Sequence, residues 1–133
     1  MKTKLFRRAI NTNLIGWFKT KRLDVIVHHD RIGKVSDCLH KNDIGGLTFY
    51  DIKGRGRSKY EPEHVGTGVM EYTPDFGTWT KIEVLVADSK LKQIVDDILQ
   101  SIGPGSASDG KIFIYDVAEA IDIGTKKTGD EVL

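Results

Sequence analysis

The fold is decided by residues 103–117, which read GPGSASDGKIFIYDV. The first six residues are glycine, proline, serine and alanine, which are typical of a flexible loop. Loops of this kind expose consecutive backbone N–H groups that bind anions, phosphate above all. Lys111 adds a positive charge at the start of an apolar strand, Ile112–Val117. On spacing alone, an ordinary connection between a helix and a strand is the better interpretation, because a single glycine loop is not specific.

The residues before this stretch predict a strand followed by an amphipathic helix. We expect the strand at Trp79–Ala87, with Ile82, Val84 and Val86 on one face. Asp88-Ser89 is a good helix cap, and the helix that follows ends at Gly103. Its apolar residues recur every three or four positions, at Leu91, Ile94, Val95, Ile98, Leu99 and Ile102.

The first half of the chain has the same order of elements. A buried strand is expected at Leu23–His28, and a second strand at Leu47–Lys53. A helix is expected between them at Arg31–Asn42, with Asp30 as its N-cap. This helix carries one apolar stripe, formed by Ile32, Val35, Cys38 and Leu39.

The resulting order, β-α-β, long loop, β-α-β, predicts an α+β, ferredoxin-like βαββαβ fold. Gly54–Thr78 shows no helical or strand period, and it is too long for an ordinary connection. Ala118–Thr125 is interpreted as a short strand or an edge segment. Two helices would cover one face of a four-stranded antiparallel sheet. We expect an apolar patch around Val84 and Ile112 on the other face, and therefore self-association.

Composition indicates one domain of 133 residues with a net charge of +1, which argues against a nucleic-acid-binding protein with a dominant positive field. The single cysteine, Cys38, excludes an internal disulfide and is expected in the core. No apolar run approaches the roughly 18 residues of a membrane span. Residues 1–22 form a basic N-terminal extension, which is compatible with an added helix packed on the domain, a membrane-surface contact or a transit-like segment. Extra packing on the domain or a flexible extension is the favoured interpretation.

No metal site or active site is predicted. The chain has four histidines, His28, His29, His40 and His64, but no pair has the separation of a zinc finger. We expect the adjacent His28 and His29 to point to opposite faces of a strand. Four carboxylates are candidates for acid–base catalysis, but no nucleophile motif accompanies them: Glu83, Asp88, Asp109 and Asp116.

A second glycine cluster, Lys53-Gly54-Arg55-Gly56-Arg57, leaves the second strand. Together with Asp109–Val117, it makes residues 23–125 resemble the PII signalling proteins. The resemblance implies a homotrimer that binds an adenine nucleotide (ATP, ADP or AMP) in the clefts between its subunits. It assigns nucleotide contacts to Thr48, Gly54, Gly56 and Arg57, and to the loop residues Ser108, Asp109, Gly110 and Lys111. Residues 126–133 would form a polar tail.

Two groups of ligand contacts in the family pattern are changed in this chain. Ser58 stands where a glutamine helps to hold magnesium and 2-oxoglutarate, and Trp79 stands where a lysine pairs with 2-oxoglutarate. Binding of 2-oxoglutarate is therefore not expected in the usual mode. Asp122 and Gly124 stand where two arginines reach a neighbour's nucleotide phosphates, which favours a nucleotide with fewer phosphates.

The resemblance also implies a cytoplasmic, non-enzymatic regulator. It would contact its partners through the long loop 54–78, called the T-loop in this family. Arg55, Tyr60 and Tyr72 are the expected contact residues. The partners expected from the family are an ammonium transporter, which would give the only link to a membrane, or glutamine synthetase; nucleic acid is not expected. Two alternatives remain open: a trimeric metal-tolerance protein of the same architecture, and a small nucleotide or acyl-phosphate hydrolase.

Overall fold

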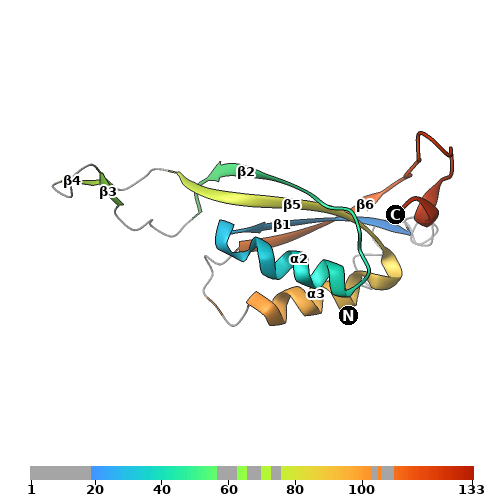
Figure 1. Cartoon of the computed structure of the whole chain (residues 1–133), viewed down its shortest axis with the longest axis horizontal. Coiled ribbons are helices and arrows are strands. Elements are labelled where there is room, and N and C mark those ends of the chain that lie inside the picture. The colour runs from blue at the N-terminus through green and yellow to red at the C-terminus, as the bar shows by residue number, and fades with distance from the viewer. Residues whose placement is uncertain (1–18, 57–62, 66–69, 73–75, 103–104, 106–109) are drawn as a thin grey trace, which may run out of the picture.

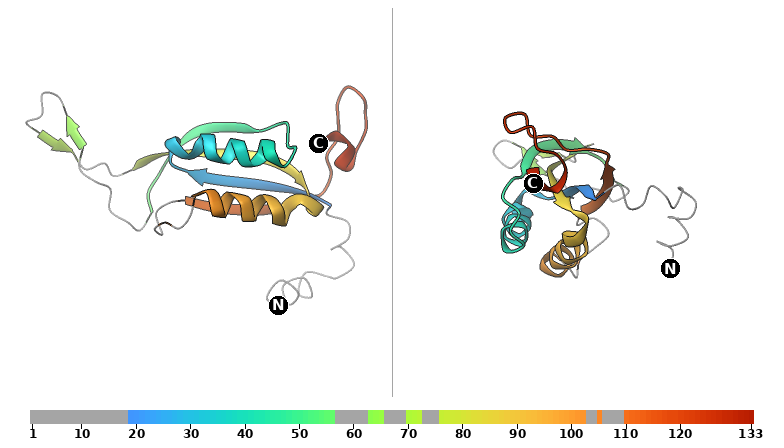
Figure 2. Two further views of the ribbon diagram at one scale, coloured as in Figure 1. Left: turned by 60° about the horizontal axis from the view of Figure 1, so that its bottom comes forward. Right: turned by 90° about the vertical axis from the view of Figure 1, so that its right-hand side faces the viewer.

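The computed structural model describes residues 19–56, 63–65, 70–72, 76–102, 105 and 110–133. Two helices lie on one face of a sheet, and the other face is open (Figures 1 and 2). The elements are, in order, β1 (Thr20–Val27), the 3-10 turn η2 (His29–Arg31), α2 (Ile32–Lys41), β2 (Thr48–Gly54), β3 (Glu63–Val65), β4 (Met70–Tyr72), β5 (Gly77–Ala87), α3 (Asp88–Ile102), β6 (Gly110–Val117) and the 3-10 turn η3 (Gly129–Val132).

The main sheet has the strand order β2-β5-β1-β6, and every neighbouring pair is antiparallel. β1 is central, so that Leu23 pairs with Val84 of β5 on one side and with Ile114 of β6 on the other. The predicted α+β, ferredoxin-like fold is confirmed. β1 begins at Thr20, three residues earlier than predicted.

The core lies between the sheet and the two helices. Ile82, Val84 and Val86 share one face of β5, as predicted, and all three are buried on the side that the helices cover. Cys38 is also in the core, as predicted, and its Sγ lies 3.1 Å from Ser101 Oγ. The predicted apolar patch around Val84 and Ile112 on the open face is wrong. Both residues face the helices, because strand alternation shows which residues share a face but not which face the helices cover.

Two local predictions are also wrong, both at the start of α2. The N-cap residue is Arg31, without a side-chain cap, and the predicted cap Asp30 lies inside η2. His28 and His29 do not belong to a strand, because β1 ends at Val27 and a 3-10 turn begins at His29.

The long loop contains a second, two-stranded sheet that the sequence did not predict. β3 and β4 pair antiparallel, with Glu63 opposite Tyr72. Figure 1 shows this hairpin beyond the ends of β2 and β5, away from the main sheet. Three-residue strands are too short to show the alternation from which strands are predicted.

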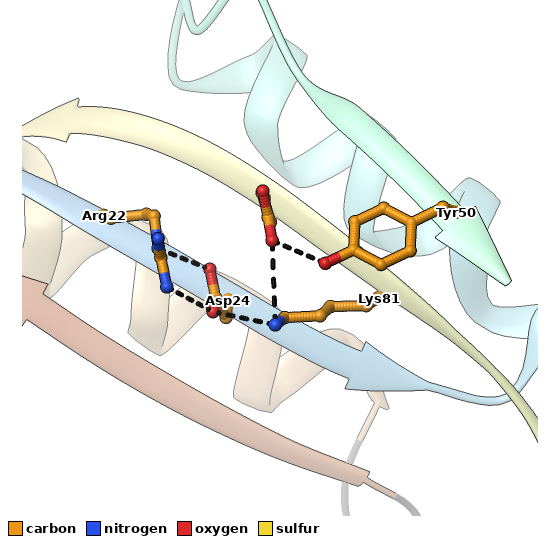
Figure 3. Close-up of polar contacts among 5 residues, drawn as sticks. Arg22, Asp24, Tyr50 and Lys81 are labelled. Carbon is orange, nitrogen blue, oxygen red and sulfur yellow. Dashed lines mark hydrogen bonds and ion pairs between the residues drawn. The ribbon is translucent and has the colours of Figure 1, made fainter. Parts of the chain in front are cut away.

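A buried carboxylate lies at the centre of the open face (Figure 3). Asp24 of β1 is fully buried, although it lies opposite another acidic residue, Glu83 of β5. Arg22 Nη2 donates to Asp24 Oδ2 at 3.1 Å, and Arg22 Nε is 3.1 Å from Asp24 Oδ1. Lys81 Nζ lies 3.4 Å from Asp24 Oδ2 and 3.6 Å from Glu83 Oε1. The two cations therefore compensate the two anions, which would otherwise repel each other.

Two tyrosines extend this cluster to the edge strands. Tyr50 of β2 donates its hydroxyl to Glu83 Oε1 at 2.7 Å, and the Arg22 guanidinium lies 4.3 Å from the centre of the Tyr115 ring on β6. The hydrogen bond from Tyr50, together with Lys81 and Arg22, lowers the pKa of Glu83 against the opposing effect of desolvation. The same hydrogen bond raises the pKa of Tyr50. A continuous polar chain thus crosses all four strands.

The C-terminal segment folds back onto the start of β1. Ala118–Thr125 forms no strand; Ile121 makes a single bridge with Thr128. Gly129 N donates to Ala120 O at 2.9 Å, and Thr20 Oγ1 donates to Asp130 Oδ1 at 2.9 Å. The polar tail is therefore attached to the domain.

Gly110→Ala is expected to destabilise the protein by roughly 3 kcal/mol or more. Gly110 has φ +145°, and a Cβ there would lie 2.2 Å from the backbone oxygen of Ile26. Gly33→Ala is the control, because Gly33 lies in α2 with no atom within 4 Å of the added Cβ, and the change is expected to be neutral or stabilising by up to about 1 kcal/mol. Urea unfolding measures both variants. Equal stability of Gly110→Ala and the wild type would show that this contact is not a constraint.

Tyr50→Phe is expected to raise the pKa of Glu83 toward its ordinary value of 4.5, because the hydroxyl donor is lost. A carboxylate with a lowered folded-state pKa stabilises the fold above its ordinary pKa, and this stabilisation is lost as the pH falls through the folded-state value. The stability difference between wild type and variant should therefore narrow in acid. Carboxyl NMR titration and urea unfolding measure the two effects. Tyr115→Phe, which keeps its ring beside Arg22, should leave the titration of Glu83 unchanged; an unchanged titration in Tyr50→Phe would contradict the assignment.

Candidate functional site

The two glycine clusters of the sequence lie at the same end of the sheet. Gly110 begins β6 and pairs with Val27, the last residue of β1. The same row continues through Thr80 of β5 to Asp51 of β2, and Gly54 follows three residues later at the end of β2. Three strand spacings, about 14 Å in total, separate β6 from β2. The topology thus brings the loop before β6 and the base of the T-loop to the same end of the sheet.

Gly110 fixes the backbone at the first of these loops. Its positive φ and its contact with the Ile26 oxygen exclude any side chain at this position. Lys111 follows immediately and is exposed, so its ammonium group is available to an anion at this end of the sheet.

The base of the T-loop is built around an aromatic pair. Trp79 of β5 stacks on His28, with ring centroids 4.0 Å apart and an interplanar angle of 23°. A Cβ at Gly54 would lie 3.8 Å from Trp79 Cδ1, so the indole lies directly beside the end of β2. Arg55 leaves this strand and lies 5.7 Å from the ring centre of Phe76, just before β5. The two strands that carry the T-loop are therefore connected at its base by side chains as well as by the sheet.

Several predicted site residues cannot be placed in this geometry. Arg57, Ser58, Tyr60, Ser108 and Asp109 lie outside the described residues. The backbone of Tyr72 lies in β4, but its side chain is outside the described part. Gly56 is described and lies just beyond Arg55, with open space around it.

The other predicted contacts lie farther along the strands, with Thr48 in the middle of the sheet and the segment after β6 at its far end. Thr48 begins β2 and is six residues from Gly54, about 20 Å along the strand. Asp122 and Gly124 follow the C-terminal end of β6, whereas Lys111 lies at its N-terminal end. One chain therefore does not bring the two sets of residues together.

Asp122 also has a local role that sequence reasoning missed. Its Oδ1 accepts a hydrogen bond from Thr125 N at 2.8 Å, and this backbone hydrogen bond lowers the pKa of Asp122. Its backbone N–H donates to Lys127 O at 2.9 Å. The carboxylate is thus part of the C-terminal turn. An Asp followed three residues later by Thr was the available signal.

Sequence reasoning also missed a polar cluster near the end of the sheet where Gly110 lies. Thr80, which is fully buried, donates to Asp51 Oδ1 at 3.0 Å, and its Oγ1 lies 3.4 Å from His29 Nδ1. These contacts attach η2 to β2 and β5. Across the described ranges of the chain, no three His, Cys, Asp or Glu side chains are grouped as metal ligands. No described helix is long and apolar enough to cross a membrane.

Comparison with known proteins gives consistent matches. Residues 20–127 match the family model described as nitrogen regulatory protein P-II. The P-II protein of Rhodospirillum rubrum is 33% identical over 113 residues, which cover 85% of this chain and 99% of that protein. Nitrogen regulatory protein P-II 1 of Escherichia coli K12 is 35% identical over 113 residues, with the same coverage of both chains.

Two solved structures share the fold. Arabidopsis thaliana PII bound to citrate has a TM-score of 0.67 and 26% identity, covering 91% of this chain and 98% of that one. The GlnK–ATP complex of B. subtilis has a TM-score of 0.67 and 24% identity, covering 87% and 99%; at this identity it supports the fold alone. The family model spans most of the chain, and the relatives are matched over nearly their whole length. The chain therefore belongs to the PII family of nitrogen regulatory proteins, which are regulators and not enzymes.

Proposed function

We propose that this protein is a cytoplasmic homotrimer that binds an adenine nucleotide between its subunits and signals the occupancy of this site through the T-loop to a partner protein. One observation carries the proposal. The loop before β6 and the base of the T-loop lie at one end of the sheet, while the segment after β6 lies at the other end. Each chain thus presents two half-sites that cannot meet each other but can meet the complementary half of a neighbour.

The open face of the sheet supports a trimer. It carries Leu85, Phe113 and Tyr115, each about 40% exposed, around the polar chain centred on Asp24. Within this cluster, the positive charges of Arg22 and Lys81 compensate the negative charges of Asp24 and Glu83. The face therefore has apolar area and no net charge from the cluster. Such a face can be buried against copies of itself without leaving a charge uncompensated. A closed cyclic assembly would also place the two half-sites of neighbouring chains side by side.

The half-site formed by the loop before β6 and the base of the T-loop suits phosphate. Gly110 excludes a side chain from the loop end, Gly56 has open space beside it, and Lys111 supplies a positive charge. The opposite half-site has Asp122 and Gly124 where the family has arginines. Neither residue supplies a cation to a neighbour's nucleotide, and the Asp122 carboxylate is engaged in its own turn. The loss of two charge-assisted hydrogen bonds, roughly 1.5–3 kcal/mol each, should reduce the preference for a triphosphate over a mono- or diphosphate.

The T-loop gives this site an output. Arg55 and Phe76 lie at its two ends and contact each other, so a ligand that orders residues around Gly56 and Arg57 also acts on the loop base. The partner surface would include Arg55, Tyr60 and Tyr72, and the partner would be an ammonium transporter, glutamine synthetase or a related protein. The stacked pair of Trp79 and His28 replaces the cation that a dicarboxylate requires, so 2-oxoglutarate is not expected to be the second signal.

Isothermal titration calorimetry with ATP, ADP and AMP tests the nucleotide site. We expect at least one nucleotide to bind, and Lys111→Ala to weaken it about ten- to hundredfold, because one charge-assisted hydrogen bond is lost. Lys92→Ala is the matched control, since Lys92 lies on α3 and pairs with Asp96. If none of the three binds at millimolar concentration, the nucleotide-sensor proposal fails. Undiminished affinity in Lys111→Ala would remove only the role of that lysine.

The same calorimetry with 2-oxoglutarate, in the presence of ATP and magnesium, tests the altered T-loop base. The wild type is expected to give no binding heat. The double variant Trp79→Lys with Ser58→Gln restores a cation and an amide at the two positions that differ from the family pattern. This variant is expected to bind 2-oxoglutarate. Trp79→Phe with Ser58→Gln is the control without a new charge. Binding by the wild type as tight as by the lysine variant would refute the argument from Trp79.

A further inference from the structure

An apolar groove lies between α3 and the edge strand β6, on the helix side of the sheet. Its volume is about 510 Å³, and its walls are mostly valine, leucine and isoleucine side chains of α3, β1 and β6. Leu99 on α3 and Ile114 on β6 line it and are 57% and 50% exposed. Both residues belong to the apolar stripes that elsewhere form the core. The groove therefore continues the core outward with nothing from the described chain covering it.

The adjacent loop has no side chain suited to fill this groove. Residues 103–109, between α3 and β6, are glycine, proline, serine, alanine and aspartate only. The C-terminal segment does not reach it either, because it folds onto the start of β1 through Thr20 and Asp130, at the opposite end of β6 from Gly110. An occupant must come from elsewhere in the chain or from another molecule.

We propose that residues 1–18 of the same chain occupy this groove as an amphipathic helix. The segment is rich in large apolar residues: Leu5, Phe6, Ile10, Leu14, Ile15, Trp17 and Phe18. Phe6, Ile10, Leu14 and Trp17 follow one another at intervals of four, four and three, which places them on one face of a helix. The basic residues Lys4 and Arg8 lie off this stripe and would face solvent. This proposal does not depend on nucleotide binding.

The point of attachment and the length both fit. Asp88 N, at the start of α3, donates to Lys19 O at 2.6 Å, so the segment joins the domain beside the beginning of α3. Leu99 lies eleven residues along α3, about 16 Å away at 1.5 Å per residue. Ile114 is three residues from Val117, the partner of Thr20. Eighteen residues of helix span about 27 Å, so a segment that turns back after a few residues can still cover the whole groove.

Trp17 gives a direct test in the full-length chain. In a Trp79→Phe background Trp17 is the only tryptophan, because the chain has two. Without nucleotide or lipid, we expect a blue-shifted emission maximum and protection from acrylamide. The pair Leu99→Asp with Ile114→Asp should shift the emission to the red and remove the protection. Ile123→Asp, at a C-terminal residue that is 93% exposed, should change neither. A red, unprotected Trp17 in the parent, or a blue shift that needs anionic lipid vesicles, would overturn the proposal.

Disulfide trapping tests the same contact without a charged substitution. In a Cys38→Ser background, Ile10→Cys with Leu99→Cys is expected to form a disulfide within one chain, visible as a faster-migrating monomer on a non-reducing gel. Gln100→Cys in place of Leu99→Cys is the control, since Gln100 lines the opposite side of α3, toward α2. A disulfide-linked dimer would assign the groove to a neighbour's segment, and equal trapping at positions 99 and 100 would show no docking; either result contradicts the proposal.

Discussion

The close approach of Gly110 to the carbonyl of Ile26 is the constraint on which the arrangement of the site depends. β1 is the central strand, and it pairs with β5 on one side and with β6 on the other. β6 can begin where it does only because residue 110 has no side chain and tolerates a φ of +145°. This start point sets the position of Lys111 and places the loop before β6 at the same end of the sheet as Gly54. A side chain at residue 110 would displace the start of the strand, and with it the charge that the proposed site requires.

The open face has a constraint of its own, because a carboxylate is buried there. Asp24 is fully buried although no helix covers it, and burial of an unpaired charge is costly. Arg22 binds it through two nitrogens, and Lys81 bridges it to Glu83. In the proposed trimer, further burial would strengthen these pairs by removing water while increasing the desolvation penalty. The cluster is therefore suited to define how copies fit together more than to add net stability.

The sequence predicted the layers of the fold because its periods are strong. The alternation of Ile82, Val84 and Val86 identified a buried face of β5, and the apolar stripe with Cys38 identified the buried side of α2. It did not show which face of the sheet the helices cover, since alternation is symmetric, and so the patch around Val84 and Ile112 was placed on the wrong side. The N-cap at Asp30 failed because a 3-10 turn begins one residue earlier, and tertiary contacts of His29 with Thr80 and Asp51 hold that turn.

The site was predictable only in part, for a topological reason. Gly54, Gly110 and Lys111 were identified by resemblance, and the strand pairing places them at the same end of the sheet. No sequence pattern shows that Asp122 lies at the other end of the sheet, because this depends on the antiparallel order of four strands. Nor did the sequence separate the possible role of Asp122 toward a neighbour from its observed role in the turn with Thr125.

This separation of the half-sites determines what a bound nucleotide can do in the proposed trimer. A ligand changes a conformational equilibrium only by the difference in its affinity for the two states. With the cations of the neighbour's half-site absent at Asp122 and Gly124, most of the phosphate contact falls on the half that contains Lys111 and the T-loop base. That half contains the T-loop base, where β2 ends and β5 begins. The binding energy would then act mainly where it can order or release the T-loop, and less on joining subunits that the open face would hold together.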